Sequence, residues 1–166
     1  MLGNHRIPKS YDRIETLGDL DEASAALGLA RALCQAPQTG ILLVEVQRDL
    51  YLIMTEIATS SEQTELFKTL DQSRIAWLDS EIESVSSSIA IPSDFIVPGD
   101  SLPGAAMDIA RTVVRRAERR VADLLARNEI RNRTPLEYLN RLSSLCFALE
   151  LAENRFSGHE TTLAKK

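Results

Sequence analysis

The chain has 166 residues, 44% of them hydrophobic and 26% charged, and it carries a formal net charge of −5 at neutral pH. This composition is typical of one folded domain and excludes a chain that is disordered throughout. The acidic balance argues against general nucleic-acid binding, which needs a basic surface, and no apolar run approaches the length that spans a membrane.

Helical periodicity dominates the first half of the chain. Apolar residues recur at i, i+3, i+4 and i+7, which is the spacing of one buried helix face. A first helix is predicted from about Asp19 to before Pro37, because Asp19 and Glu22 have the spacing of a capping box. Two further helices are predicted over about residues 39–59 and 64–88.

Residues 94–104 interrupt this pattern with two Pro-Gly pairs. The chain should be extended just before Pro98, because a residue that precedes proline avoids the helical region. A turn is expected at Pro98-Gly99, and Pro103 is well placed near the start of a fourth helix.

The fourth helix contains the most unusual stretch of the chain, five arginines and one glutamate between residues 111 and 120. Arg111, Arg115 and Glu118 share one helical face. Guanidinium groups bind phosphate oxygens in bidentate fashion, and an interleaved glutamate can hold them in place. The stretch therefore favours a polyphosphate ligand, and an ordinary solvated face is the alternative. The opposite, apolar stripe consists of Ile109, Ala110, Val113, Ala117, Val121 and Leu124.

A fifth helix is predicted from Thr134, which has capping-box spacing with Glu137. A polar, flexible tail should follow over residues 157–166. The expected fold class is therefore all-α, a five-helix bundle without strands. Residues 1–166 are expected to form a single domain that includes an N-terminal segment, 1–17.

The cysteines and histidines do not have the spacing of a metal site. Cys34 and Cys146 lie in apolar helical patterns, so both are expected to be buried free thiols in a reducing compartment. His5 and His159 lie near the termini and should be solvated, so no metal ligand is predicted among them. The cytoplasm is the expected location, because no signal-peptide pattern opens the sequence.

Three segments, taken together, resemble the PduO-type ATP:cob(I)alamin adenosyltransferases. The first runs from Arg6-Ile-Pro-Lys9 to Leu27-Gly28, the second from Phe95-Ile-Val-Pro-Gly99 through the arginine stretch, and the third is Tyr138-Leu-Asn-Arg-Leu-Ser143. They span nearly the whole chain in the order and spacing of that family. The resemblance implies a five-helix bundle that assembles as a homotrimer, with active sites between subunits.

The resemblance also implies a reaction. Enzymes of this family transfer the 5′-deoxyadenosyl group of ATP to the cobalt of a reduced corrinoid, which yields adenosylcobalamin and triphosphate. ATP, Mg²⁺ and cobalamin are the implied small molecules, and a B12-dependent enzyme or a reductase is an implied protein partner. No nucleic acid or membrane partner is expected.

Site residues follow from the resemblance position by position. Arg115 is implied as a catalytic residue that stabilises the leaving triphosphate. Phe95 is implied as a catalytic residue that closes the lower face of the corrinoid, and Ser144 lies at a corrinoid-side position. Asp21 and Arg111 match a pair that joins one subunit to the next. The implied ATP-binding residues are Lys9, Arg115, Arg116, Glu118, Arg119 and Asn140.

Each of these positions also has an ordinary structural alternative. Lys9 could be a solvated lysine, Asn140 a surface residue, and Phe95 a core anchor between the third and fourth helices. Asp21 and Arg111 could form a surface ion pair, which typically contributes less than about 1 kcal/mol.

Three departures from the family pattern keep other functions open. The chain starts with Met1-Leu-Gly-Asn-His-Arg6, which aligns just after a family loop of the form Thr-x-x-Gly-Asp, so that ATP loop is expected to be missing. Ser144 replaces an aspartate, and Asp100 replaces a glycine and is expected to add negative charge near the corrinoid. A catalytically silent relative that binds ATP or a corrinoid is therefore the alternative, and a purely structural trimeric bundle is a third hypothesis.

Overall fold

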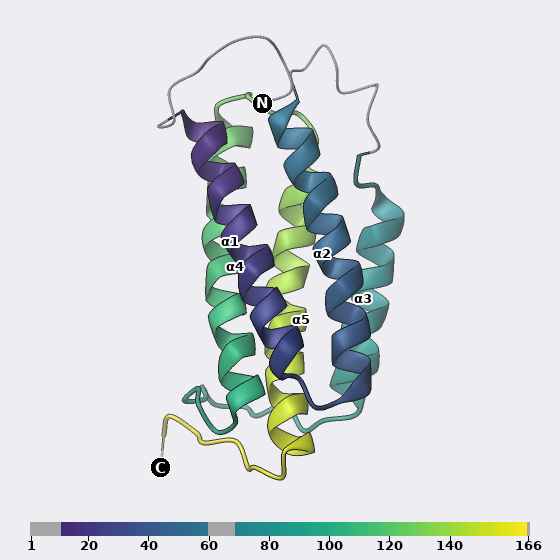
Figure 1. Ribbon diagram of the computed structural model, residues 1–166, viewed down its shortest axis with the longest axis vertical. Coiled ribbons are helices and arrows are strands. Elements are labelled where there is room, and N and C mark those ends of the chain that lie inside the picture. The colour runs from purple at the N-terminus through teal and green to yellow at the C-terminus, as the bar shows by residue number, and fades with distance from the viewer. Residues whose placement is uncertain (1–10, 60–68, 166) are drawn as a thin grey trace.

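The computed structural model describes residues 11–59 and 69–165, and these ranges contain five α-helices that lie roughly along one long axis (Figure 1). The helices are α1 (Asp12–Leu33), α2 (Pro37–Ala58), α3 (Gln72–Ser87), α4 (Leu102–Ala126) and α5 (Thr134–Phe156). The all-α, five-helix class predicted from the sequence is thus confirmed. No helix in the described part is both long and apolar enough to cross a membrane.

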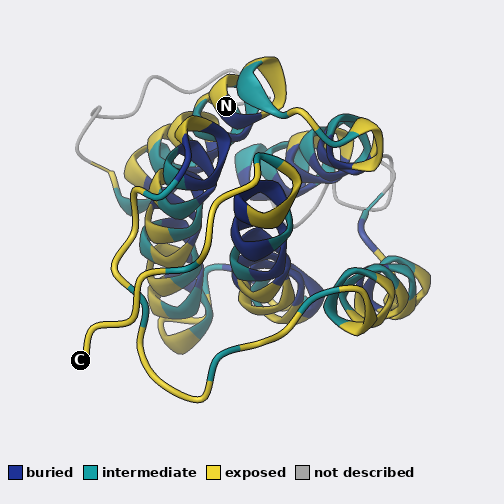
Figure 2. Ribbon diagram, turned by 90° about the horizontal axis from the view of Figure 1, so that it is seen from below, coloured by how far each residue is buried: buried dark blue, intermediate teal, exposed yellow. Residues whose placement is uncertain are grey.

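Helix α5 lies at the centre of the bundle. It packs extensively against α4 and against α3, while α1 packs against α4 and α2. Fourteen of the 23 residues of α5 are buried, which is the pattern of a helix covered on most of its sides. A view along the bundle shows the buried residues facing inward and the exposed ones outside (Figure 2).

Helix α1 starts at Asp12, so the prediction that it starts near Asp19 is wrong. The buried stripe of α1 continues toward the N-terminus through the polar residues Arg13 and Thr16, and an apolar periodicity cannot reveal such positions. Arg13 is buried because it donates hydrogen bonds to the backbone carbonyls of Ile57 (3.2 Å) and Thr59 (2.9 Å) at the end of α2. These bonds satisfy carbonyls that the helix end leaves free.

The predicted start of the third helix and the predicted cap of the fifth helix are also wrong. Helix α3 begins at Gln72, with Asp71 as a cap that accepts a hydrogen bond from the Ser73 amide (2.9 Å), and the predicted residues 64–68 lie outside the described ranges. Helix α5 has no side-chain cap from Thr134, which is already helical. Its amide donates instead to Asn132 Oδ1 (3.0 Å), so the preceding turn supplies the cap.

The start of α4 is fixed against the end of α5. Ser101 caps α4 by accepting a hydrogen bond from the Gly104 amide (3.0 Å), and its hydroxyl donates to Asn154 Oδ1 (2.6 Å). A Cβ atom at position 104 would lie 2.1 Å from Asn154 Oδ1, so only glycine allows this close approach. The predicted apolar stripe of α4 is buried except for Ile109, which is 53% exposed.

The C-terminal segment pairs with the loop that precedes α4. Ile96 and Leu163 form an isolated antiparallel bridge, and Asp100 accepts hydrogen bonds from the amide (2.8 Å) and hydroxyl (2.6 Å) of Thr162. These bonds lower the pKa of Asp100, so its carboxylate stays charged and holds Thr162. Gly99 turns the loop with φ at +122°, a conformation that favours glycine.

Both cysteines are free thiols, but only one is fully buried. Cys146 has no exposed surface, and burial raises the pKa of its thiol to about 12. Cys34 is half-buried, so the prediction of a buried thiol is wrong at that position. Cys34 directly follows the last turn of α1, and its thiol donates a hydrogen bond to the Arg31 carbonyl oxygen (3.0 Å).

Candidate functional site

The arginine helix and the last helix are joined by a small polar network. Asn140 of α5 donates a hydrogen bond to Glu118 of α4 (Nδ2 to Oε1, 2.9 Å). Glu118 in turn lies 3.5 Å from the guanidinium of Arg115, one turn earlier on α4. The Arg115 side chain is 49% exposed, whereas the Glu118 side chain is only 15% exposed. The network therefore orients a guanidinium whose other donors face solvent, which suits an anionic ligand.

Arg116 and Arg120 face a different neighbour. Arg116 pairs with Asp19 (3.2 Å) and Glu22 of α1, and Arg120 pairs with Asp19 (3.2 Å). These carboxylates neutralise part of the arginine stretch and hold α1 to α4. The predicted ATP residues thus do not form a single cluster within one chain, because Arg116 lies over α1 whereas Arg115 lies over α5.

Arg119 lies on the outer surface of the same helix. It lines a shallow hollow of about 460 Å³ together with Arg116 and Arg120. Arg119 makes no ion pair or side-chain hydrogen bond within the described residues. Its charge is therefore free for a ligand or for another chain.

A second hollow, of about 550 Å³, lies at the loop end of α4. Phe95 is 87% exposed at this hollow, so the alternative that it is a core anchor is wrong. Phe147 of α5 and Lys165 of the C-terminal segment also face it. The remaining lining residues are Ser93, Asp94, Ile96, Pro98, Asp108 and Arg111. Two aromatic rings beside charged groups can bind a flat, amphipathic ligand.

Arg111 lies between this hollow and the bundle interior. Its Nε donates to Asp108 Oδ1 (2.8 Å), one turn earlier on α4. The predicted partner Asp21 is exposed on α1 and does not pair with Arg111 within one chain. A pairing between subunits stays a prediction.

A buried carboxyl group lies behind the Asp108–Arg111 pair. Glu150 has no exposed surface, and neither of its side-chain oxygens has a hydrogen-bond partner within the described ranges. Burial, together with the nearby negative charge of Asp108, raises the pKa of Glu150 to about 7, although the positive charge of Arg111 partly opposes this rise. Glu150 is therefore only partly ionised at neutral pH.

The two parts of the site share one face of the α4–α5 pair. Glu118 contacts Asn140 at one end, and Arg111 and Phe147 line the same hollow at the other. Since α4 and α5 are antiparallel (Figure 1), Arg115 and the exposed Ser144 lie between these ends. From Glu118 to Arg111 the helix rises about 10 Å, at 1.5 Å per residue.

Sequence reasoning missed three residues of this face. Phe147 is seven residues after Asn140 on α5, so helical spacing could have placed it there. Asp108 precedes Arg111 by one helical turn, so helical spacing could have placed Asp108 on this face as well. Glu150 gave no signal, because a glutamate in a helix is normally exposed. Lys9 lies outside the described residues, so the structure does not place it.

Comparison with known proteins identifies a consistent set of relatives. The sequence model of one protein family, described as cobalamin adenosyltransferase, matches residues 1–153. The chain is 34% identical over 159 residues to a cobalamin adenosyltransferase of Cupriavidus metallidurans, covering 95% of this chain and 83% of that protein. It is 33% identical over 167 residues to the corrinoid adenosyltransferase PduO of Citrobacter freundii. That match covers 100% of this chain but 49% of the relative, so the chain spans about half the length of that protein.

The fold also matches solved structures. A variant of a PduO-type ATP:corrinoid adenosyltransferase from Lactobacillus reuteri, complexed with cobalamin and ATP, superposes with a TM-score of 0.88. The two chains are 27% identical, and the match covers 99% of this chain and 92% of the other. A second variant of that protein, complexed with ATP, matches with a TM-score of 0.85 at 28% identity, covering 96% of this chain and 90% of the other.

Proposed function

This chain belongs to the cobalamin adenosyltransferase family, and from this premise we propose that it transfers the 5′-deoxyadenosyl group of ATP to the cobalt of a reduced corrinoid. In this reaction Co(I) attacks the C5′ carbon, the cobalt–carbon bond forms, and the C5′–oxygen bond breaks to release triphosphate. The substrates would be ATP, as its Mg²⁺ complex, and cobalamin.

One observation carries this proposal. The half-exposed guanidinium of Arg115 lies on the α4–α5 face, and the exposed ring of Phe95 lines the hollow at the loop end of that face together with Arg111 and Phe147. An anion-binding end next to an aromatic hollow suits a reaction that joins a nucleotide to a flat macrocycle. Each reacting partner would thus have its own end of the same face.

Arg115 would act on the leaving group. Negative charge builds on the triphosphate as the C5′–oxygen bond breaks, and a guanidinium already oriented by Glu118 stabilises that charge without further reorganisation. Asn140 would support this role by holding Glu118 in place, in addition to any direct contact with ATP. Lys9, Arg116 and Arg119 would add further phosphate contacts.

Phe95 would act on the cobalt. Its exposed ring, together with Phe147, offers an apolar surface that would exclude water and other axial ligands from the lower face of the corrinoid. A cobalt ion without a lower ligand is easier to reduce to Co(I). Ser144 would lie on the corrinoid side of the same face.

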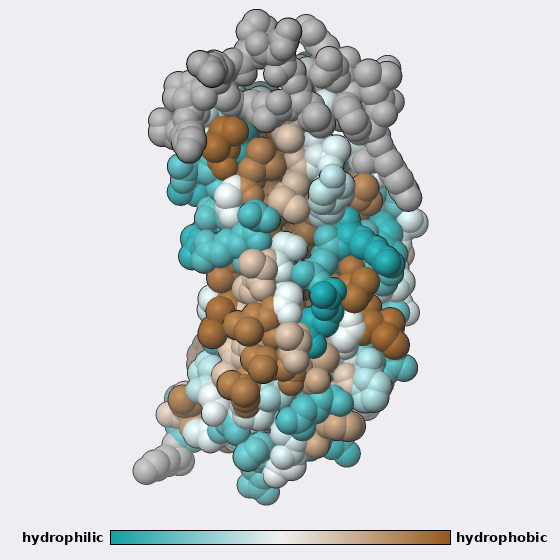
Figure 3. All heavy atoms as spheres, in the orientation of Figure 1, coloured by the Kyte–Doolittle hydropathy of each residue, from teal (hydrophilic) through white to brown (hydrophobic). Residues whose placement is uncertain are grey.

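We propose a homotrimer as the functional assembly. Helices α1 and α4 carry exposed apolar side chains, Leu29 (51%) and Ile109 (53%), which a neighbouring subunit would cover. Figure 3 shows hydrophobic atoms gathered over the lower half of the face in which α1 and α2 lie in front. Asp21 would pair with Arg111 of a neighbouring subunit. Arg111 would then either leave Asp108 for this partner or pair with both carboxylates.

The free thiols support a reducing, cytoplasmic location.

The experiment compares two arginine variants. Arg115→Ala should lower turnover by about 100-fold or more, because loss of one preorganised donor costs about 3 kcal/mol in the transition state. Arg48→Ala removes an exposed arginine of α2, far from this face, and should keep full activity. Formation of adenosylcobalamin from Mg²⁺-ATP and chemically reduced cob(I)alamin is followed by absorbance. Equal turnover in the two variants would contradict the assignment of Arg115.

A further inference from the structure

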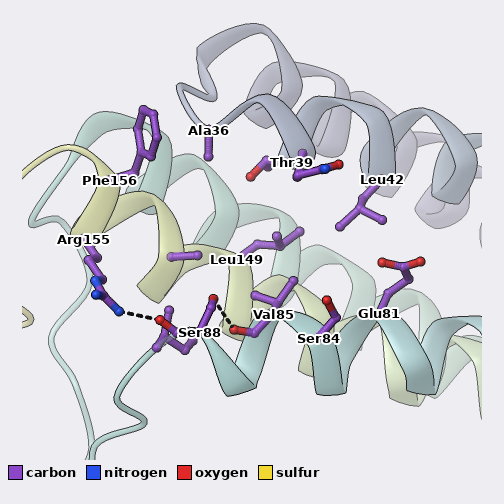
Figure 4. Close-up of a pocket in the computed structure, with 13 residues that line it drawn as sticks. Ala36, Thr39, Leu42, Glu81, Ser84, Val85, Ser88, Leu149, Arg155 and Phe156 are labelled. Atoms are coloured by element: carbon purple, nitrogen blue, oxygen red, sulfur yellow. Dashed lines mark hydrogen bonds between the residues drawn. The ribbon is translucent and has the colours of Figure 1, made fainter.

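Another hollow lies away from the proposed active site. It has a volume of about 760 Å³ and runs between the first turns of α2, the second half of α3 and the end of α5 (Figure 4). Leu149 of α5 lies in this groove, whereas Ser144 lies on the active-site face. Five residues turn a helix by roughly 140° beyond a full turn, so the groove opens on another side of α5.

The groove has an apolar floor. Leu42 of α2, Val85 of α3 and Leu149 of α5 point into the groove from its three sides (Figure 4). Helices α2 and α3 do not pack extensively against each other, since α2 packs mainly against α1 and α3 packs mainly against α5. On α3, Ile75 and Leu78 are buried while Ile82 and Val85 remain only partly buried. The bundle therefore leaves the second half of α3 incompletely covered.

Opposite charges lie at the two ends of the groove. Glu81 is at one end, and Arg155 is at the other, beside Ser88 (Figure 4). Arg155 donates one N–H to the Ser88 carbonyl, and its remaining N–H groups have no partner within the described residues. Glu81 has no ion pair or hydrogen bond to another side chain there. Both charges are thus available to an occupant of the groove.

The spacing of these charges fits a helix. Glu81 and Ser88 are seven residues apart on α3, so the two charged ends are separated by about two helical turns, roughly 10 Å. A helix laid along the groove would place residues i and i+7 at the two ends and residues i+3 and i+4 over the apolar floor.

We propose that this groove docks an amphipathic α-helix of a partner protein. The docked helix presents a basic residue to Glu81, an acidic residue seven positions away to Arg155, and aliphatic residues to Leu42, Val85 and Leu149. Because the groove opens away from Arg115, such a partner binds without blocking the proposed active site.

Three synthetic helical peptides test this proposal. They share one amphipathic sequence with leucines at i+3 and i+4 and differ only at i and i+7, which are Lys/Glu, Glu/Glu or Lys/Lys. The Lys/Glu peptide places its lysine at Glu81 and its glutamate at Arg155 when its N-terminal end lies at Glu81, so the test predicts this direction for the docked helix. Binding to the full chain is measured by isothermal titration calorimetry. The wild-type chain should prefer the Lys/Glu peptide by about threefold to fivefold per mismatched charge.

Charge-reversal variants sharpen the test. Glu81→Lys should shift the preference to the Glu/Glu peptide, and Arg155→Glu should shift it to the Lys/Lys peptide. Both side chains are near the surface, and circular dichroism checks that each variant keeps its helical content. If no peptide binds the wild-type chain, or if the preference does not follow these substitutions, the proposal is wrong.

A blocking variant separates the groove from other surfaces. Ser84→Trp places a large ring at an exposed position that lines the groove and should abolish binding of the Lys/Glu peptide. Ser80→Trp makes the same change one turn earlier, outside the lining residues, and should keep binding. Equal binding by the two variants would overturn the proposal. Self-association of the wild-type chain that only Ser84→Trp removes would make a second copy the occupant, and this too would overturn it.

Discussion

Glu150 should limit the stability of the protein above neutral pH. Its carboxyl group is fully buried without a hydrogen-bond partner in the described structure, and burial raises its pKa from 4.5 to about 7. At pH values between these two pKa values, the folded state holds more protons than the unfolded state, so the free energy of unfolding falls as pH rises. A shift of this size corresponds to about 3 kcal/mol, at about 1.4 kcal/mol per pKa unit.

Glu150→Gln removes the titration and keeps the shape of the protonated side chain. The variant should therefore gain about 3 kcal/mol over the wild type when pH rises from 4.5 to 8, whatever constant offset the amide introduces. Urea unfolding, followed by circular dichroism over this range, measures the difference at one fixed protein concentration, because assembly makes stability concentration-dependent. Glu83→Gln, an exposed change on α3, is the matched control and should show no such trend.

The result that would refute this reasoning is a constant difference. If Glu150→Gln and the wild type differ in unfolding free energy by the same amount at pH 4.5 and pH 8, then Glu150 does not titrate in this range. An ordinary pKa would mean that water or another chain satisfies its carboxylate.

Three further predictions concern packing and the proposed reaction. Tyr138→Phe should destabilise the fold by about 1.5–3 kcal/mol, because the buried hydroxyl donates to the Asp49 carboxylate (2.7 Å), and urea unfolding measures the loss. Gly104→Ala should cost about 1–3 kcal/mol by thermal unfolding, since its Cβ would meet Asn154 Oδ1 at 2.1 Å, and Asn154→Ala in the same chain should recover part of it. Phe95→Ala should lower turnover at least tenfold when cob(II)alamin and a reductant are supplied, because the ring favours reduction of the cobalt ion. With cob(I)alamin the loss should be much smaller, and equal losses in the two assays would contradict that role.

The arginine helix shows what a sequence pattern can specify. Its apolar residues recur every three or four positions, so Ala110, Val113 and Ala117 were correctly predicted to be buried. The same reasoning failed at Ile109, because a periodicity marks an apolar residue without showing whether the single chain covers it. The predicted start of α1 was wrong for the opposite reason, because Arg13 is buried although it is polar, and an apolar periodicity does not mark such a residue.

The candidate site was only partly predictable. The pattern placed Arg115 and Glu118 on one face, and the structure joins them to Asn140 through an ion pair and a hydrogen bond. Which arginine faces α1 could not be read from the sequence, because Arg115 and Arg116 are adjacent and only the packing of α1 against α4 decides it. The positions of Glu81 and Arg155 at the two ends of one groove likewise depend on tertiary structure alone.

One measurement tests the central claim most directly. The wild-type chain is incubated with Mg²⁺-ATP and chemically reduced cob(I)alamin, and adenosylcobalamin and inorganic triphosphate are quantified together. We expect both products in equal amounts, at a rate proportional to protein concentration. If ATP raises the melting temperature of the folded chain but neither product forms, the proposed reaction is contradicted. The protein would then be a relative that only binds its ligands.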